Sequence, residues 1–146
     1  MTRTAVLVPA AGRGERLGPG SPKALRDIAG VPMLVHAVHA VAASPAVDLV
    51  VIAAPESEVD VVTGLLGRST FNAEVSVVSG GSTRQESVAR ALITLPDDVD
   101  VVLVHDAARP LVPVEMVTEV VASVRAGNPC VIPGLAVTDT IKEVDT

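Results

Sequence analysis

The chain reads Val8-Pro9-Ala10-Ala11-Gly12-Arg13-Gly14-Glu15-Arg16-Leu17 near its start, and Ser21-Pro22-Lys23 follows shortly after. The apolar run Ala5–Val8 predicts a β-strand that leads directly into this turn of small residues. Small residues let backbone N–H groups approach phosphate oxygens closely, and the cations Arg16 and Lys23 can stabilise charge that develops in a transition state. The segment lacks both the third glycine of a dinucleotide fingerprint and a Walker A ending. A tight turn with solvated charges is the structural alternative, but Pro22-Lys23 favours a phosphate-binding loop.

Apolar runs and helical patterns alternate along the rest of the chain. Further strands are predicted at Leu49–Ala53, Val75–Val78, Val101–Val104 and Cys130–Pro133. Their β-branched, non-alternating character is typical of strands buried on both faces of a parallel sheet. Helices are predicted from Pro32, over residues 56–66, from a capping box at Ser82-Thr83-Arg84-Gln85, and from Pro113 to Arg125. This order predicts an α/β fold, a Rossmann-like doubly wound and mostly parallel sheet, with ligands at the carboxyl ends of its strands.

The composition restricts the possible partners. The 146 residues carry a formal net charge of −6, and Phe71 is the only aromatic residue among Phe, Tyr and Trp. A single-strand nucleic-acid binder would need stacking platforms and positive charge, so no nucleic-acid partner is expected. No stretch approaches the roughly 20 apolar residues that cross a bilayer, so no membrane association is expected. Cys130 is the only cysteine; we expect it to be a small buried apolar residue in a reducing, cytoplasmic location.

Two more polar clusters follow predicted strands. In Ser79-Gly80-Gly81-Ser82-Thr83-Arg84, the two glycines are expected to expose backbone donors and acceptors that could read the edge of a base. An ordinary loop with a helix cap is the alternative, and Ser82 and Ser87 each have a competing structural role.

The second cluster is His105-Asp106-Ala107-Ala108-Arg109-Pro110. Asp106 could hold a metal, a ribose hydroxyl or a sugar-like substrate, and Arg109 could bind a second anion; an Asp–Arg pair that shapes the turn is the alternative. His105 is expected to point away and to make a structural hydrogen bond, because neighbouring strand residues alternate sides. His36 and His39 are interpreted as helix-surface or partner-facing residues rather than metal ligands.

The motifs together resemble the 2-C-methyl-D-erythritol 4-phosphate cytidylyltransferases of the non-mevalonate isoprenoid pathway. The similarity runs along the whole chain. It rests on Pro9-Ala10-Ala11-Gly12-x-Gly14-x-Arg16-Leu17, Pro22-Lys23, Gly80-Gly81, Arg84, Ser87-Val88, His105-Asp106-Ala107-Ala108-Arg109-Pro110 and Asp139-Thr140-Ile141-Lys142. The first motif is shared with many sugar-nucleotide pyrophosphorylases, whereas the hexapeptide from His105 and the element from Asp139 are more specific. Ser82 and Ala24 depart from the acidic residue and the glutamine common at these positions.

The resemblance implies a fold of the nucleotide-diphospho-sugar transferase type and transfer of a cytidylyl group from CTP to the substrate phosphate. It implies that Arg16 and Lys23 stabilise the transition state and that Asp106, Arg109 and Thr140 orient the methylerythritol phosphate. It implies Mg²⁺ as cofactor, with Asp106 as a possible ligand. The CTP-binding positions that it implies are Pro9, Ala10, Ala11, Gly12, Gly14, Gly80, Gly81, Ser82, Ser87 and Ala107.

The resemblance also implies a homodimer, in which Thr140 reaches the partner subunit through an arm. Residues 1–136 are expected to form the CTP-binding core, and residues 137–146 the start of a β-arm that the chain, expected to be truncated, does not complete. A ribitol 5-phosphate cytidylyltransferase, a nucleotidyltransferase for hexose phosphates and a non-catalytic nucleotide-binding fragment remain the alternatives.

Overall fold

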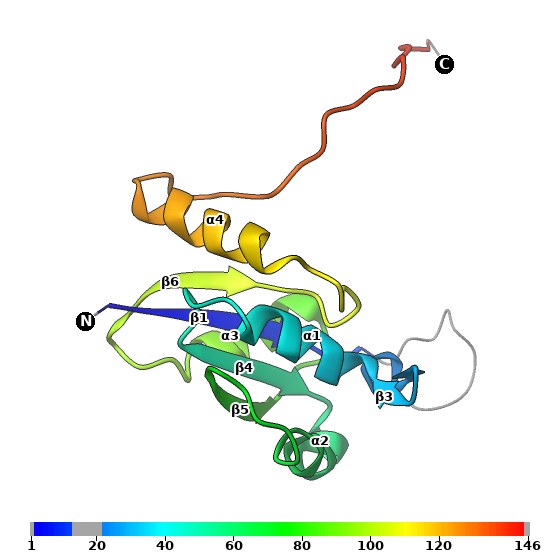
Figure 1. Cartoon of the computed structure of the whole chain (residues 1–146). Coiled ribbons are helices and arrows are strands. Elements are labelled where there is room, and N and C mark those ends of the chain that lie inside the picture. The colour runs from blue at the N-terminus through cyan, green and yellow to red at the C-terminus, as the bar shows by residue number, and fades with distance from the viewer. Residues whose placement is uncertain (1, 13–21, 145–146) are drawn as a thin grey trace.

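A four-stranded parallel sheet forms the centre of the protein (Figure 1). The structure is a computed structural model that describes residues 2–12 and 22–144. The sheet has the order β5-β4-β1-β6, with all three pairings parallel. Its strands are β1 (Arg3–Pro9), β4 (Leu49–Ala54), β5 (Glu74–Ser79) and β6 (Val99–Val104). After β1, the chain adds β4 and β5 on one side of it and then β6 on its other side. This reversal at β1 is typical of a doubly wound sheet, which is the arrangement predicted from the sequence.

Helices cover both faces of this sheet. Helices α1 (Met33–Ala42), α2 (Val59–Leu66) and α4 (Val114–Arg125) pack on one face, and α3 (Arg84–Leu92) packs on the other (Figure 1). The short 3-10 helices are η2 (Lys23–Leu25) and η3 (Glu56–Glu58). Strands β2 (Asp27–Ile28) and β3 (Val31–Pro32) pair with each other in a separate two-stranded sheet. The fold is therefore a doubly wound α/β sheet, as predicted.

The central strands are buried because both of their faces are covered. All six residues of β4 are buried. Along β1, Val6 and Val8 face the cluster under α1, whereas Ala5 and Leu7 face the cluster under α3. This double burial explains why β1 and β4 read as continuous apolar runs rather than alternating ones.

The first four predicted strands are confirmed, with boundaries within two residues. The fifth prediction is wrong, because residues 130–133 form no strand and Cys130 is exposed rather than buried. The predicted capping box is displaced by one residue: Thr83 is the N-cap of α3, and its Oγ1 accepts a hydrogen bond from the Glu86 N–H at 3.0 Å. Pro113 precedes α4 as expected, and Gly127 follows it with a φ of +102°.

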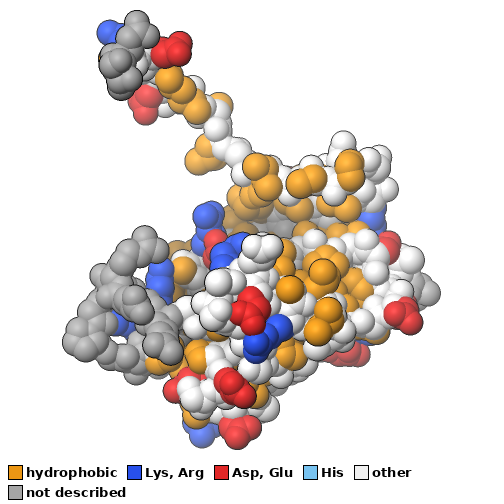
Figure 2. Space-filling view, turned by 180° about the vertical axis from the view of Figure 1, so that it is seen from behind, with side chains coloured by type: hydrophobic (Ala, Val, Ile, Leu, Met, Phe, Trp, Pro, Cys, Tyr) orange, Lys and Arg blue, Asp and Glu red, His pale blue; other side chains and the backbone are white. Residues whose placement is uncertain are grey.

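The chain beyond α4 leads away from the sheet (Figure 1). Residues 131–144 form neither helix nor strand and are almost entirely exposed, so the strand-like alternation from Thr138 is not realised as a β-arm here. On the α3 face, Val102 and Val104 of β6 remain 39% and 46% exposed, and Figure 2 shows hydrophobic side chains at that surface. Among the residues described, no helix is both long and apolar enough to span a membrane.

Candidate active site

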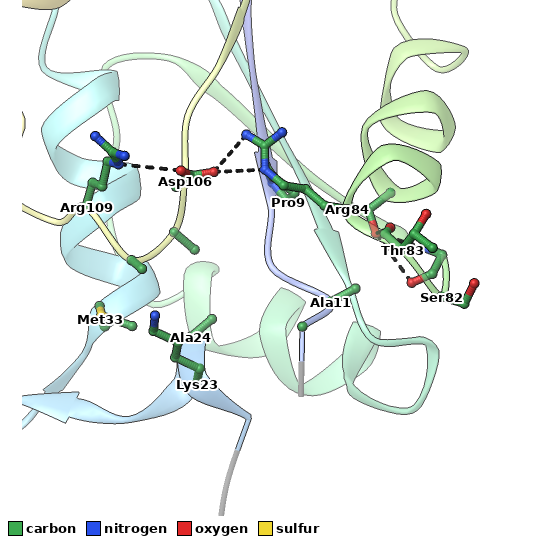
Figure 3. A pocket seen from close by; sticks show the side chains of 15 residues that line it. Pro9, Ala11, Lys23, Ala24, Met33, Ser82, Thr83, Arg84, Asp106 and Arg109 are labelled. Atoms are coloured by element: carbon green, nitrogen blue, oxygen red, sulfur yellow. Dashed lines mark hydrogen bonds and ion pairs between the residues drawn. The ribbon is translucent and has the colours of Figure 1, made fainter. Parts of the chain in front are cut away.

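A pocket of about 500 Å³ lies at the carboxyl ends of β1, β5 and β6. This is the edge at which doubly wound sheets bind ligands, and the volume suits a small-molecule ligand. The lining comes from the loops after β1, β5 and β6, from η2 and from the starts of α1 and α3 (Figure 3). Its walls are formed by Pro9, Ala11, Gly12, Lys23, Ala24, Met33, Gly81, Ser82, Thr83, Arg84, Ser87, Asp106, Ala107, Ala108 and Arg109.

The loops after β1 and β5 touch each other behind this pocket. A Cβ atom added to Gly80 would lie 2.6 Å from Ala11 Cβ and 3.1 Å from the Ala54 carbonyl oxygen. The Gly80 N–H donates to that same oxygen at 2.7 Å. Only glycine permits this approach, so Gly80 brings the two loops together without itself lining the pocket.

Helix α3 holds the loop that precedes it. Ser87 Oγ accepts from the Gly81 N–H at 3.0 Å and donates to the Thr83 carbonyl at 2.9 Å. The Glu86 carboxylate accepts from the Ser82 N–H and Oγ at 2.8 and 2.9 Å. These bonds, together with one from Arg90, lower the pKa of Glu86. The N–H groups of Gly80, Gly81 and Ser82 are thus all bonded within the protein, so the prediction that the glycines expose backbone donors is wrong.

Asp106 sits between two arginines (Figure 3). Its Oδ1 accepts from Arg84 Nη2 at 2.8 Å and Nε at 3.1 Å, and its Oδ2 lies 3.4 Å from Arg109 Nε. The hydrogen bonds from Arg84 are the main reason why the pKa of Asp106 is lowered, and the charge of Arg109 acts in the same direction. Asp106 is therefore ionised at neutral pH, and its side chain remains 38% exposed.

The pocket is positively charged in a protein of net negative charge. Three of its walls carry the cations Lys23, Arg84 and Arg109, against the single carboxylate of Asp106. Within residues 2–12 and 22–144, no carboxylate lies within ion-pairing distance of the Lys23 amino group. Because the whole chain has a net charge of −6, this local excess of cations favours a small anionic ligand over a polyanionic surface.

His105 has a structural role, as predicted. Its Nε2 lies 2.9 Å from the Arg109 carbonyl oxygen, which can only accept, so Nε2 carries the ring proton. Burial lowers the pKa of His105, so the ring is neutral at neutral pH. The His36 Nε2 lies 3.0 Å from the Ile28 carbonyl oxygen, and the His39 ring contacts the Phe71 ring in a tilted arrangement. Neither belongs to a group of three potential metal ligands within the part of the chain that the structure describes.

Comparison with known proteins identifies the family. Residues 4–146 match the family of 2-C-methyl-D-erythritol 4-phosphate cytidylyltransferases. The chain belongs to this family. It is 54% identical over 145 residues to the 2-C-methyl-D-erythritol 4-phosphate cytidylyltransferase of Streptomyces avermitilis, covering 98% of this chain and 58% of that protein. It spans little more than half the length of the curated relatives that it matches, at 58%, 54% and 52%.

The chain is also similar to solved structures, among them the following two. One is a crystal structure of a 4-diphosphocytidyl-2C-methyl-D-erythritol synthase, with a TM-score of 0.76 and 26% identity, which covers 99% of this chain and 65% of the other. The second is the 2-C-methyl-D-erythritol 4-phosphate cytidylyltransferase from Thermus thermophilus, with a TM-score of 0.59 and 30% identity, covering 85% of this chain and 50% of the other.

Most of the residues assigned by resemblance to the cytidylyltransferase family line one pocket. They are Pro9, Ala11, Gly12, Lys23, Gly81, Ser82, Ser87, Asp106, Ala107 and Arg109. Ala10 is buried beneath the pocket and Gly80 lies behind it. Thr140 is exposed in the segment after α4 and does not line the pocket. Gly14 and Arg16 lie outside the described residues.

Several residues that line this pocket have no role that the sequence alone assigns. Arg84 and Thr83 line the wall at the start of α3, and Met33 does so at the start of α1. Arg84 already stood within the motifs shared with the family, inside the predicted capping box that follows a strand. That position was the available signal that its side chain could reach the site.

Proposed function

We propose that the protein transfers CMP from CTP to 2-C-methyl-D-erythritol 4-phosphate, giving 4-diphosphocytidyl-2-C-methyl-D-erythritol and pyrophosphate for isoprenoid precursor synthesis. The observation that carries this proposal is the convergence of Lys23, Asp106 and Arg109 on one pocket, in a chain of the cytidylyltransferase family. Lys23 comes from η2 and the other two from the loop after β6, so the fold brings together groups that suit a phosphate-rich ligand with hydroxyls.

The proposed reaction needs positioning and charge stabilisation rather than a general base. An oxygen of the acceptor phosphate attacks the α-phosphorus of CTP, and the bond to the pyrophosphate leaving group breaks. That acceptor oxygen is already ionised near neutral pH, so no side chain has to remove a proton. In our proposal Lys23, together with Arg16, stabilises the charge on the pentacoordinate phosphorus.

Small residues form the proposed CTP-binding walls. The proposed CTP-binding positions are Pro9, Ala10, Ala11, Gly12, Gly14, Gly80, Gly81, Ser82, Ser87 and Ala107; Ala10 and Gly80 would support the lining without forming it. The N–H groups of Gly80 and Gly81 are bonded internally, whereas the Gly81 carbonyl accepts, from the residues that the structure describes, only a long 3.4 Å bond from Ser87. An available carbonyl acceptor matches the amino group of cytosine better than the carbonyl oxygen of uracil, which supports CTP as the nucleotide.

Mg²⁺ is part of this proposal as a companion of CTP. Both oxygens of the Asp106 carboxylate already face arginines, so this carboxylate does not fit the role of a sole metal ligand. Magnesium in nucleotide enzymes is held largely by the substrate phosphates and water. We therefore propose that the metal arrives with the triphosphate and neutralises part of its charge.

The segment after the core is proposed to serve the acceptor and the dimer. We propose that residues 1–136 form the CTP-binding core and that residues 137–146 begin an arm, with Thr140 directed to a partner subunit's site and the active protein a cytoplasmic homodimer. Asp106 and Arg109 are the proposed acceptor-orienting residues of the core. The support is the family motif around Thr140 and the exposure of that segment.

The test is pyrophosphate release with Mg²⁺ and CTP, comparing 2-C-methyl-D-erythritol 4-phosphate with ribitol 5-phosphate as acceptor. We expect release with the first acceptor and with CTP rather than UTP or GTP. Lys23→Ala should lower kcat by roughly 10²–10³-fold while the fold persists, by analogy with the removal of one preorganised donor. Near-normal turnover in folded Lys23→Ala would refute the assigned role. No release with either acceptor, by this chain and by one extended to the relatives' length, would refute the function.

A further inference from the structure

Arg84 occupies a position that helix stability does not explain. It is the first residue of α3, directly after the Thr83 cap. A cation at a helix N-terminus is disfavoured by the helix dipole. Its side chain is 62% exposed, so burial of apolar surface does not offset that cost. The reason for an arginine here is therefore found in what its guanidinium group contacts.

Both hydrogen bonds of the Arg84 guanidinium go to one carboxylate oxygen. Nη2 and Nε reach Asp106 Oδ1 at 2.8 and 3.1 Å, from the start of α3 to the loop after β6 (Figure 3). The other oxygen, Oδ2, faces Arg109 at 3.4 Å. A carboxylate offers about four acceptor positions, so Oδ1 is saturated and Oδ2 retains one position for a further donor.

We propose that Arg84 is a positioning residue for Asp106, which it orients so that Oδ2 accepts a hydrogen bond from a hydroxyl group of the bound ligand. This inference rests on the proposed function, in which the ligand is a phosphate ester that carries hydroxyls. The hydroxyl belongs to the polyol of the acceptor or to the ribose of CTP, and both present the same donor to Oδ2.

Arg109 is a weaker candidate for this orienting role. It lies three residues from Asp106 on the same loop, its side chain is 77% exposed, and its contact is longer and single. Arg84 instead approaches from a regular helix whose start is fixed by the Thr83 cap and by Ser87. A donor held on a rigid element positions its partner better than one on the same loop.

The first test needs no turnover. The pKa of the Asp106 carboxyl group is followed by carbon-detected NMR in the ligand-free wild type, Arg84→Gln, Arg109→Gln and the control Arg68→Gln, which removes one arginine from an exposed site remote from the pocket. The groups whose charge acts on Asp106 are Arg84, Arg109 and, at pH values where its ring is protonated, His105. We expect Arg84→Gln to raise this pKa toward its ordinary value by more than Arg109→Gln does, and Arg68→Gln to leave it unchanged. An unchanged pKa in Arg84→Gln would overturn the inference.

The second test asks whether Arg84 acts through Asp106 or binds the ligand itself. Arg84→Gln should lower kcat/KM roughly 10-fold in the wild-type background but less than about 2-fold in Asp106→Asn, the coupling expected of two residues that act as a unit. Arg84→Lys should recover part of the loss. Equal losses in both backgrounds would mean direct ligand contact and would overturn the inference.

The same variants distinguish the two possible sources of the hydroxyl group. They also distinguish failure of this inference from failure of the proposed function. A rise in KM for the acceptor alone points to the polyol hydroxyl, whereas a rise for CTP that is absent with 2′-deoxy-CTP points to the ribose. If neither this chain nor one extended to the relatives' length releases pyrophosphate, the proposed function fails. The positioning of Asp106 by Arg84 is still decided by the NMR measurement, which does not depend on turnover.

Discussion

Two glycine-to-alanine substitutions should change stability in opposite directions. Gly80 lies where the loops after β1 and β5 meet, whereas Gly64 lies inside α2 with no atom within 4 Å of an added Cβ. Gly80→Ala inserts a methyl group into a filled space, and Gly64→Ala inserts the same group into open space. The pair therefore tests whether the contact between the two pocket loops is as close as the structure has it.

The magnitude follows from the distances. The added Cβ at Gly80 would lie 2.6 Å from Ala11 Cβ and 3.0 Å from Ser87 Oγ, whereas carbon atoms pack favourably at about 3.5–4.0 Å. Relief requires a shift of about 1 Å between loops that are fixed by the sheet, and overpacking of this kind costs about 1–3 kcal/mol. If Ser87 Oγ is displaced, the Gly81 N–H loses its partner at a further cost of about 1 kcal/mol. We expect Gly80→Ala to lower the free energy of unfolding by about 2–4 kcal/mol.

Gly64→Ala should raise the free energy of unfolding by about 0.5–1 kcal/mol, because alanine loses less backbone entropy than glycine in a helix. Thermal unfolding followed by circular dichroism measures both. For a domain of this size we expect Tm to fall by about 8–16 °C in Gly80→Ala and to rise by about 2–4 °C in Gly64→Ala. A Tm for Gly80→Ala within about 2 °C of the wild type would refute the close packing of the two loops.

Two further predictions concern the groups around the pocket. Ser87→Ala removes the acceptor of the Gly81 N–H and should lower the free energy of unfolding, measured in urea, by about 1–3 kcal/mol. The matched control Ser79→Ala loses only a 3.5 Å bond and should lower it by less than about 0.5 kcal/mol. Equal losses in the two variants would contradict the role of Ser87. Burial lowers the pKa of His105 in the folded state, so just below the ordinary histidine pKa the unfolded state binds more protons than the folded state. The free energy of unfolding should therefore fall as the pH is lowered from about 7.5 to about 5.5. His105→Asn should flatten that dependence, and an unchanged slope would argue against the buried neutral ring.

The fold could be predicted where the sequence pattern has one physical cause. Strands β1 and β4 are buried on both faces, so their apolar runs indicate a parallel sheet directly. The run at residues 130–133 is also apolar, yet it forms no strand and Cys130 is exposed. A short apolar run needs neighbouring strands to pair with, and composition alone does not say whether they are present.

The sequence predicted which loops contribute to the site, but not which hydrogen bonds and ion pairs join their side chains. Lys23, Asp106 and Arg109 were assigned by motif and meet in one pocket. Spacing did not show that the Gly80 N–H bonds the Ala54 carbonyl, that its carbonyl accepts from Arg90, or that the absence of a Cβ permits the close approach to Ala11. Which of several arginines reaches Asp106 depends on helix placement in three dimensions, so the bond from Arg84, 22 residues away in sequence, could not be read from spacing.

The arrangement of charges in the pocket explains how such a site could be selective as well as attractive to anions. Three cations alone would attract any small polyanion. Asp106 changes this, because it takes up two of them, Arg84 and Arg109, and adds an acceptor that repels phosphate oxygens but accepts from hydroxyls. Lys23, on the opposite wall (Figure 3), has no carboxylate partner among the described residues, so its charge would remain available to a phosphate group. A ligand with phosphate at one end and hydroxyls at the other could bind both Lys23 and Asp106, whereas a bare polyphosphate could bind only the Lys23 side.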